Sequence, residues 1–335
     1  MRRMRILCYV FLAICLIIIF KILFNVCVDV TDDKFTNLNL CPACYGSNLC
    51  PHFFHGKISL IGISKFEYFK VINNKNVYSG KLNSDRVILK KLAHCWEIIE
   101  KDMIVCKKAK SDESCRVNEA LLMIIESCRD SSRKIDLLSL FNALDIKTDM
   151  SHCTSKRLLS YILGKIYNTS NELHKIGQMM YGLIVNPEAV LLQAFPQAEG
   201  WPFPHYYGSC GRIIVEEYVG RTLTYFEDAP WKQRIDISYQ LLLIAQMLTE
   251  NFSNFALYMT DVNMDNFAVR SDGTVLLIDV EGIVVVDRFK TKGQKLHESK
   301  GEYCKDCLNF SYEDLCNSDL SDHNYYAILP DTSTC

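Results

Sequence analysis

Short apolar runs that suit β-strands alternate along the chain with longer stretches in which apolar residues recur at helical spacing. The clearest strand pattern lies at residues 267–278, where two apolar runs flank a polar turn at residues 271–273. An Asp-Gly turn between two β-rich runs predicts a hairpin. This hairpin would end at Asp279 and bring that residue back beside Asn266.

Residues 231–250 carry the clearest helical pattern, because Ile235, Leu242 and Leu248 recur at helical spacing behind an Asp-Ala-Pro-Trp start signal. Residues 135–186 are also amphipathic and are predicted to be mainly helical. The long helix at 231–250 leads directly into the segment that precedes the hairpin.

Two further pairs of strands are predicted upstream. A polar turn at residues 83–85 separates the β-rich runs 76–82 and 86–92. Residues 190–194 and 212–217 suit a second pair of strands, separated by a turn rich in proline, glycine and aromatic residues.

The N-terminus carries the pattern of a secretory targeting segment. Three arginines within the first five residues precede the apolar stretch 6–20, and after Lys21 the apolar pattern continues to Val28 before the acidic Asp29. This order of charges places the basic end in the cytosol. Residues 1–28 are therefore expected to form either a signal anchor or a cleaved signal peptide, and the lack of an Ala-x-Ala site favours the anchor.

The cysteine content agrees with entry into the secretory pathway. Sixteen cysteines in 335 residues are too many for an ordinary cytosolic protein. Disulfides are therefore preferred over zinc sites, the other chemistry that the spacing allows. Glycosylation sequons begin at Asn168, Asn251 and Asn309, and fit a lumenal glycoprotein. The cysteines expected to form disulfides are the clusters Cys41, Cys44 and Cys50, and Cys304, Cys307 and Cys316.

The overall charge excludes one class of partner. The net charge is −2 and 23% of the residues are charged, so no polyanion-binding face is implied. Nucleic acid is therefore not an expected partner.

Asp261, Asn266 and Asp279 carry the candidate chemistry. Asp261 and Asn266 have the Asp-x-x-x-x-Asn spacing of the protein-kinase catalytic loop, and the hairpin returns Asp279 to them. Phosphoryl transfer needs one Asp near the acceptor hydroxyl, and an Asn and a second Asp on the cation that binds the phosphates. Asp261 is therefore predicted to be catalytic, and Asn266 and Asp279 to bind Mg²⁺ or Mn²⁺. The alternative is that all three are ordinary turn and strand-end residues.

Lys90 is the candidate for a lysine that contacts the phosphates of ATP. A kinase small lobe presents a strand lysine to the phosphates and holds it with a helical glutamate. Strand alternation puts Lys90 and Lys91 on opposite faces, and Lys91 is the alternative. Glu119 is predicted as the helical partner, with Glu113 and Glu126 as alternatives on nearby turns.

Residues 216–220 would form the hinge of a kinase, where backbone groups of Glu217 and Val219 contact adenine. Two kinase features are missing from the sequence. No Gly-rich loop precedes Lys90, and the Asp-Phe-Gly element is replaced by Asp-Val-Glu at Asp279. No Ala-Pro-Glu element follows, which leaves the platform for a peptide substrate in question.

In this order the segments resemble the divergent protein kinase domain family, and within it the type 2 branch, the "deleted in autism" group of secretory-pathway kinase-like proteins. The resemblance implies an α+β, bilobal, protein-kinase-like fold and residence in the Golgi apparatus or outside the cell. The segments that carry it include CPACYGSNLC at 41–50, GWPFPHYYGSCGR at 200–212, FALYMTDVNMDNFAV at 255–269, IDVEG at 278–282 and DHNYYA at 322–327.

The resemblance also implies a division of the chain. Residues 29–56 would form a Cys-rich lumenal segment after the targeting segment. Residues 57–220 would form a small lobe with a helical insertion. Residues 221–335 would form a large lobe with an incomplete C-terminus.

Two functions are compatible with these residues. The first is an ATP- and metal-dependent phosphotransferase that acts on a lumenal or extracellular substrate, and the retained Lys90, Asp261, Asn266 and Asp279 favour it. The second is a pseudokinase that acts as a secreted signal or a Golgi-resident binding protein for a receptor. The missing Gly-rich loop and the Asp-Val-Glu element favour the second function. In either case residues 1–28 would contact the membrane.

Overall fold

The fold is described from a computed structural model that covers most of the chain. Most of the predicted targeting segment, Glu113, Cys304, Cys307 and the sequons at Asn168 and Asn309 lie outside the described residues. Among the helices that are described, none has the length and apolar character needed to cross a membrane. The described residues are 14, 27–66, 76–110, 115–131, 134–167, 171–289, 294–296 and 310–334.

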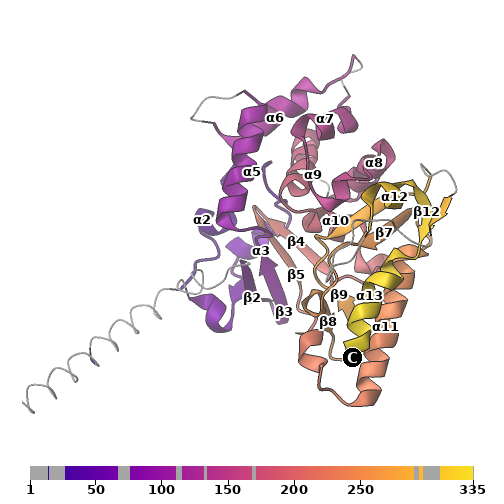
Figure 1. The fold of residues 1–335 in the computed structure, drawn as a ribbon. Coiled ribbons are helices and arrows are strands. Elements are labelled where there is room, and N and C mark those ends of the chain that lie inside the picture. The colour runs from indigo at the N-terminus through magenta and orange to yellow at the C-terminus, as the bar shows by residue number, and fades with distance from the viewer. Residues whose placement is uncertain are drawn as a thin grey trace, which may run out of the picture.

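A five-stranded antiparallel sheet forms one part of the molecule (Figure 1). In sheet order its strands are β1 (Ile58–Leu60), β2 (Val77–Leu82), β3 (Asp85–Lys90), β5 (Ile213–Glu217) and β4 (Tyr206–Cys210). The predicted hairpin around residues 83–85 is confirmed, and Asn83 adopts the positive φ of 55° that its turn requires. The predicted strand at 212–217 is confirmed as β5.

The two faces of β3 have different surroundings. Val87 and Leu89 are fully buried in a small core beside Phe53 and Tyr78. This core lies under the short helices α2 (Asp33–Thr36) and α3 (Cys50–Phe54), which contribute Phe35 and Phe53 to it. Because side chains alternate along a strand, Lys90 points to the opposite face. That face is the one on which the candidate site is built.

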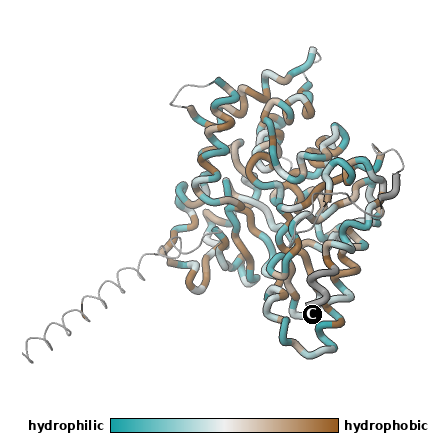
Figure 2. The backbone as a smooth tube through the Cα atoms, viewed as in Figure 1, coloured by the Kyte–Doolittle hydropathy of each residue, from teal (hydrophilic) through white to brown (hydrophobic). Residues whose placement is uncertain are grey.

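The chain between β3 and β4 is mainly helical, and the first five of its described α-helices form the group shown in magenta in Figure 1. Figure 2 shows hydrophobic and hydrophilic residues alternating along these helices, as expected where each helix buries one face. Asp136, Ser155 and Asn171 accept hydrogen bonds from backbone N–H groups at the N-termini of three of them. The helices are α5 (Cys95–Lys108), α6 (Val117–Ser127), α7 (Leu137–Leu144), α8 (Lys156–Lys165) and α9 (Glu172–Val185).

The strand predicted at residues 190–194 is wrong, because these residues belong to the helix α10 (Glu188–Ala194). Nearly every residue of α10 is buried, so its sequence has no polar face and no helical period to detect. A short, continuous apolar run cannot be assigned to strand or helix from its pattern alone. The correction matters because α10 begins with Glu188, which contributes to the candidate site.

The C-terminal half contains the elements predicted around the candidate catalytic loop. The predicted helix at 231–250 is confirmed as α11 (Trp231–Thr249), and the predicted hairpin is confirmed as β8 (Phe267–Val269) and β9 (Val275–Leu277). β6 (Arg221–Thr222) pairs with β8. The strand before the loop, β7 (Phe255–Met259), pairs antiparallel with β10 (Ile283–Asp287), which follows Asp279.

The last described segment packs against this half. It comprises α12 (Tyr312–Asn317), β12 (Ser318–Ser321) and α13 (His323–Thr334), and β12 pairs with β11 (Gln294–Leu296). Figure 1 shows α13, in yellow, lying along α11. Asn324 is fully buried there. Its amide accepts a hydrogen bond from Met259 N at 2.9 Å and donates to Leu257 O at 2.7 Å and Thr249 Oγ1 at 2.9 Å.

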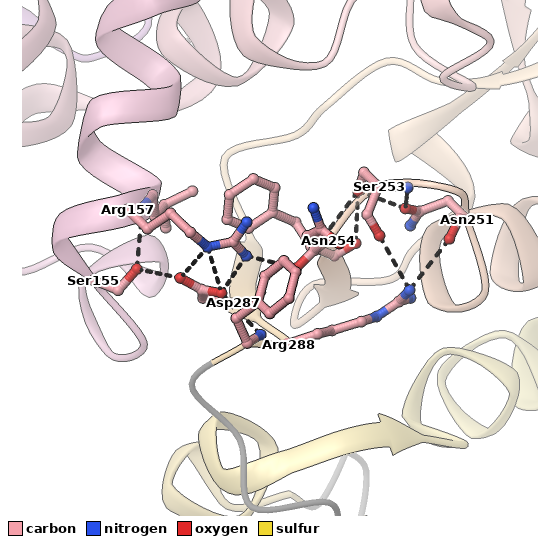
Figure 3. Close-up of polar contacts among 10 residues, drawn as sticks. Ser155, Arg157, Asn251, Ser253, Asn254, Asp287 and Arg288 are labelled. Carbon is pink, nitrogen blue, oxygen red and sulfur yellow. Dashed lines mark hydrogen bonds and ion pairs between the residues drawn. The ribbon is translucent and has the colours of Figure 1, made fainter.

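An ion pair joins the helical insertion to the strand β10 (Figure 3). Arg157 of α8 donates to both carboxylate oxygens of Asp287 and also to Asn254 O, and Ser155 donates to Asp287. Burial alone would raise the pKa of Asp287, but the bonds from Arg157 and Ser155 lower it below its usual value. The next residue, Arg288, donates to the backbone of Asn251 and Ser253 (Figure 3). These contacts fix the end of β10.

The expectation of disulfides rather than zinc is confirmed for the cysteines that are described. Among the described residues, no group of three or more His, Cys, Asp or Glu side chains is arranged to hold a metal. Cys27, Cys95 and Cys128 are free thiols. The bonds between described cysteines are Cys41–Cys44, Cys50–Cys210, Cys106–Cys115 and Cys153–Cys316. Such bonds are typical of proteins of the secretory pathway rather than the cytosol.

The substitution Asn324→Leu tests how much the contact between α13 and β7 stabilises the fold. It leaves three buried backbone and hydroxyl groups without their partner, so the free energy of unfolding should fall by about 3 kcal/mol or more. Urea denaturation measures the change. The matched control is Asn317→Leu, an exposed amide on α12, which should change stability by no more than about 0.5 kcal/mol. Equal losses of stability in the two variants would contradict the stabilising role of the buried Asn324 contacts.

Candidate active site

Lys90 lies at the centre of the candidate site, where three separate segments meet. Its ammonium is 2.9 Å from Glu188 Oε1 of α10 and 2.8 Å from Glu216 Oε1 of β5. It also donates to Ile278 O at 2.8 Å, directly before Asp279. The side chain of Lys90 is 13% exposed and those of both glutamates are 3% exposed. Lys90 therefore connects the five-stranded sheet and α10 to the segment that follows the β8–β9 hairpin.

Burial and charge oppose each other in this cluster. Burial alone would lower the pKa of Lys90, but the charges of Glu188, Glu216 and Asp279 raise it above its usual value. Burial raises the pKa of Glu188 to about 8 against the effect of Lys90. Burial likewise raises the pKa of Glu216, again opposed by Lys90. Two carboxylates thus surround one ammonium in a site with little water.

The predicted pairing of Lys90 with Glu119 is wrong. Glu119 is on α6, its side chain is 60% exposed, and it forms an ion pair with Arg116 at 2.9 Å. Glu126, one of the alternatives, pairs with Arg129 on the same helix. Lys90 takes Glu188 instead. The physical reason is that Glu188, at the start of α10, is buried within reach of Lys90, whereas the side chain of Glu119 lies exposed on α6.

The choice between the two strand lysines is clear in the structure. Lys91, the alternative to Lys90, points away from Glu188 and Glu216. Its Nζ lies 3.5 Å from Lys34 O and 5.3 Å from the centre of the Phe35 ring. Only Lys90 faces the cleft that contains Asp279.

The candidate catalytic loop is held by its own asparagines. Asn263 caps the short 3₁₀ helix η6 (Met264–Asn266) by accepting from the N–H groups of Asp265 and Asn266. Asn266 donates to Asp261 Oδ2 at 3.1 Å and to Asp261 O at 3.2 Å. Asn266 is 4% exposed, whereas Asp261 is exposed. The Asp-x-x-x-x-Asn spacing therefore closes a tight loop with its carboxylate toward solvent.

The hairpin brings Asp279 to this loop through the backbone. Ile278 N donates to Asn266 O at 2.7 Å, so Asp279 and Asn266 lie on adjacent segments. Among the described residues, the carboxylate of Asp279 accepts one hydrogen bond, from Glu281 N at 3.4 Å. Asp279 is half-buried and lines a cavity of about 200 Å³ together with Lys90 and Glu188. Lys90 and Asp279 thus line the same cavity, and the backbone of Ile278 connects them to the Asp261–Asn266 loop.

The donors in this cleft fit a hard cation in chemical type. Mg²⁺ and Mn²⁺ prefer carboxylate and amide oxygens, and Mg²⁺ in phosphoryl-transfer sites takes few ligands from the protein itself. The carboxylate of Asp279 has no side-chain partner among the described residues, so its oxygens are open to a cation. Asn266 is the neighbouring amide. These two residues would hold the cation.

The segment predicted as a hinge leaves the sheet at the end of β5. Glu217 does not turn toward the cleft, because its carboxylate accepts two bonds of 2.8 Å from Arg270. Its N–H donates to His205 O. Val219 is buried against Ala268 and Leu276, and no hydrogen bond of its backbone to another described residue is present. The N–H of Glu217 is therefore already taken, whereas the backbone of Val219 has no such bond among the described residues.

Sequence reasoning missed the residues that support the catalytic loop from outside it. Asp149, in the 3₁₀ helix η3 (Asp149–Ser151), accepts from Thr260 Oγ1 and from Tyr312 OH, each at 2.6 Å. His323 Nε2 donates to Met259 O at 2.6 Å. Asp149 and His323 thus hold the two residues directly before Asp261, although they come from distant segments of the chain. Only the DHNYYA segment gave a signal, and it came through resemblance.

Comparison with known proteins finds relatives along most of the chain. A family model described as the protein-kinase domain of FAM69 matches residues 180–330. Divergent protein kinase domain 2A of Xenopus tropicalis is 37% identical over 325 residues, which cover 90% of this chain and 75% of that protein. The human protein of the same name is 36% identical over 324 residues, with the same coverage. Mouse divergent protein kinase domain 2B is 27% identical over 291 residues, covering 82% of this chain and 66% of the relative.

His323 should make the segment before Asp261 sensitive to mild acid. Burial lowers the pKa of His323 below the unfolded value of 6.5, so the folded state prefers the neutral ring. Its stabilising effect is therefore present above pH 6.5 and is lost as the pH falls through the lower, folded pKa. Thermal unfolding should show a smaller loss of stability between pH 7.5 and 5.5 in His323→Gln than in wild type. The exposed His55→Gln is the control and should follow wild type; a parallel loss in all three proteins would refute the assignment.

Proposed function

We propose that this chain, which belongs to the divergent protein kinase domain 2 family, binds ATP with Mg²⁺ or Mn²⁺ in the cleft at Lys90 and transfers a phosphoryl group to a hydroxyl acceptor in the secretory pathway. One observation carries the proposal. The carboxylate of Asp279 faces the cavity beside Lys90 with no side-chain partner among the described residues, next to the closed Asp261–Asn266 loop. The carboxylate is half-buried and lines the cavity, so it is placed to take a cation there.

Each residue has one role in this proposal. Lys90 binds phosphate oxygens and Glu188 orients its ammonium. Asp279 and Asn266 hold the cation, which neutralises phosphate charge during transfer. Asp261, exposed at the mouth of the loop, accepts the proton of the attacking hydroxyl. The Val219 backbone contacts the adenine ring.

The charges around the cavity support a requirement for a cation. Glu97, Asp279 and Glu281 line it together with Glu188, whose pKa burial raises to about 8, and Lys90 is the one lysine in the lining. The carboxylates that line the cavity repel the negatively charged phosphates of ATP. ATP therefore needs added positive charge to bind there. The cation supplies that charge.

The cellular setting is also a proposal. The disulfides and the sequence of residues 1–28 support a lumenal or extracellular body behind a signal anchor or signal peptide. In this setting the acceptor is a lumenal or extracellular substrate. We assign residues 57–220 to the small lobe and residues 221–335 to the large lobe, with the cleft between them.

A pseudokinase that acts as a secreted or Golgi-resident binding protein is the second candidate. One observation favours it: the three N–H donors of Lys90 are all taken by protein acceptors. A lysine in this state has no donor left for phosphate. The sequence also lacks a Gly-rich loop to cover one.

Two substitutions separate binding from transfer. Asp279→Asn removes a cation ligand while keeping shape, so it should abolish the stabilisation by ATP with Mg²⁺ or Mn²⁺ in thermal-shift titrations. Asp261→Asn should keep that stabilisation and lose phosphoryl transfer to a generic acceptor protein by about a hundredfold or more. The matched control is Asp265→Asn in the same loop, whose carboxylate bonds Thr222 and Thr224 instead of facing the cleft.

The two candidate functions give different results in these assays. If wild-type protein gains no stability with ATP and either cation, the phosphotransferase proposal is excluded and the pseudokinase reading stands. Binding of ATP without any phosphoryl transfer would contradict the phosphotransferase proposal and indicate a protein that binds nucleotide without using it.

The secretory setting has its own test at Asn251, the sequon that the structure describes. Asn251 lies partly exposed in the turn after α11. Protein expressed in animal cells should lose mass on glycosidase digestion, and Asn251→Gln should remove one glycan. The control is Asn254→Gln. Asn254 is an exposed amide three residues away that does not belong to a sequon. Recovery in the cytosol without any mass change would contradict a lumenal location.

A further inference from the structure

The ammonium of Lys90 is fully satisfied by the protein. A lysine has three N–H donors, and here each has a close acceptor: Glu188 Oε1 at 2.9 Å, Glu216 Oε1 at 2.8 Å and Ile278 O at 2.8 Å. A phosphate oxygen can bind Lys90 only if one of these acceptors is released. The structure therefore describes a closed state of the lysine.

Glu216 is the acceptor that the proposed chemistry does not need. One carboxylate, Glu188, is enough to orient the lysine on the phosphates. The carbonyl of Ile278 is fixed, because Ile278 N is bonded to Asn266 O at 2.7 Å. Glu216 adds a second carboxylate to Lys90 from β5, three residues before Val219.

The surroundings of Glu216 indicate that its position is not set by stability. The residue is 2% exposed, and its Oε2 is buried with no hydrogen-bond partner among the described residues. An unsatisfied buried carboxylate oxygen destabilises a fold. Burial and the negative charge of Asp279 both raise the pKa of Glu216, so its charged form is disfavoured further. Because the carboxylate of Glu216 is unfavourable for stability in this position, we infer that it has a role in the site at Lys90.

We propose that Glu216 is a positioning residue that competes with phosphate for Lys90, so that nucleotide binds only by exchanging the Lys90–Glu216 contact for a phosphate oxygen. This inference rests on the proposed function, because it concerns access to the same nucleotide site. In the closed state Glu216 shields the lysine from phosphate. In the open state Lys90 keeps Glu188 and turns its freed donor to the nucleotide.

The competition predicts a gain of affinity on mutation, which a merely structural residue would not give. Glu216→Met keeps the volume, removes the competing acceptor and leaves Lys90 paired with Glu188. It should bind ATP with Mg²⁺ about tenfold or more tightly than wild type, within the usual range for coupled sites. Glu216→Gln keeps one acceptor oxygen without its charge, so its affinity should lie between the two.

The test is isothermal titration of the purified full-length protein with ATP and Mg²⁺. It compares wild type with both Glu216 variants and with Glu188→Gln, which should bind no more tightly than wild type. Thermal unfolding without nucleotide checks that each protein is folded. Glu100→Gln, an exposed change on α5, is the surface control and should match wild type.

The outcomes distinguish the two proposals. Tighter binding in Glu216→Met and Glu216→Gln but not in Glu188→Gln supports the competition. Equal affinities in wild type and the Glu216 variants overturn this inference and leave the proposed function standing. Equal tightening in Glu188→Gln also overturns it, because total charge alone would then explain the gain. Folded proteins of which none binds ATP overturn both proposals.

Discussion

A single buried ammonium organises this molecule. Lys90 cannot lie in a dry interior without acceptors, because desolvation of an unpaired charge is far more costly than any nearby hydrophobic contact can offset. Its acceptors are 98 and 188 residues away along the chain at Glu188 and Ile278. The sheet, the exit of the helical insertion and the hairpin must therefore all be in place before the charge is satisfied. The geometry of the cleft follows from that requirement.

The segment before Asp261 is positioned by long-range contacts rather than by a local motif. Met259 and Thr260 occupy the places of the histidine and arginine of a kinase H-R-D element. The backbone of Met259 is held by His323 and Asn324, and the hydroxyl of Thr260 by Asp149. The helical insertion and the last described helix thus support the loop from two sides.

The parts of the site that could be predicted from the sequence are those built by neighbouring residues. The β8–β9 hairpin and the Asp261–Asn266 loop are local, so turn chemistry and spacing identify them. The lysine partner could not be found in this way. The expected partner of a kinase strand lysine is a glutamate on an amphipathic helix. Glu119 lies on such a helix, but its side chain pairs with Arg116 instead of Lys90. Glu188 begins a helix with no polar face, and Glu216 follows an apolar run in a strand, so neither has a pattern that indicates burial beside a lysine. The roles of Lys90, Asp261, Asn266 and Asp279 in catalysis remain predictions.

The Cys153–Cys316 bond also has a consequence for biosynthesis. Its two thiols are separated by 163 residues of chain. Because a chain is made from its N-terminus, Cys153 is present beside earlier cysteines such as Cys115 and Cys128 before Cys316 has been made. Asp149 and Tyr312, which flank the two cysteines, meet only when the later segment arrives. The Cys153–Cys316 bond can therefore form only late, after the segment that carries Tyr312 has been made.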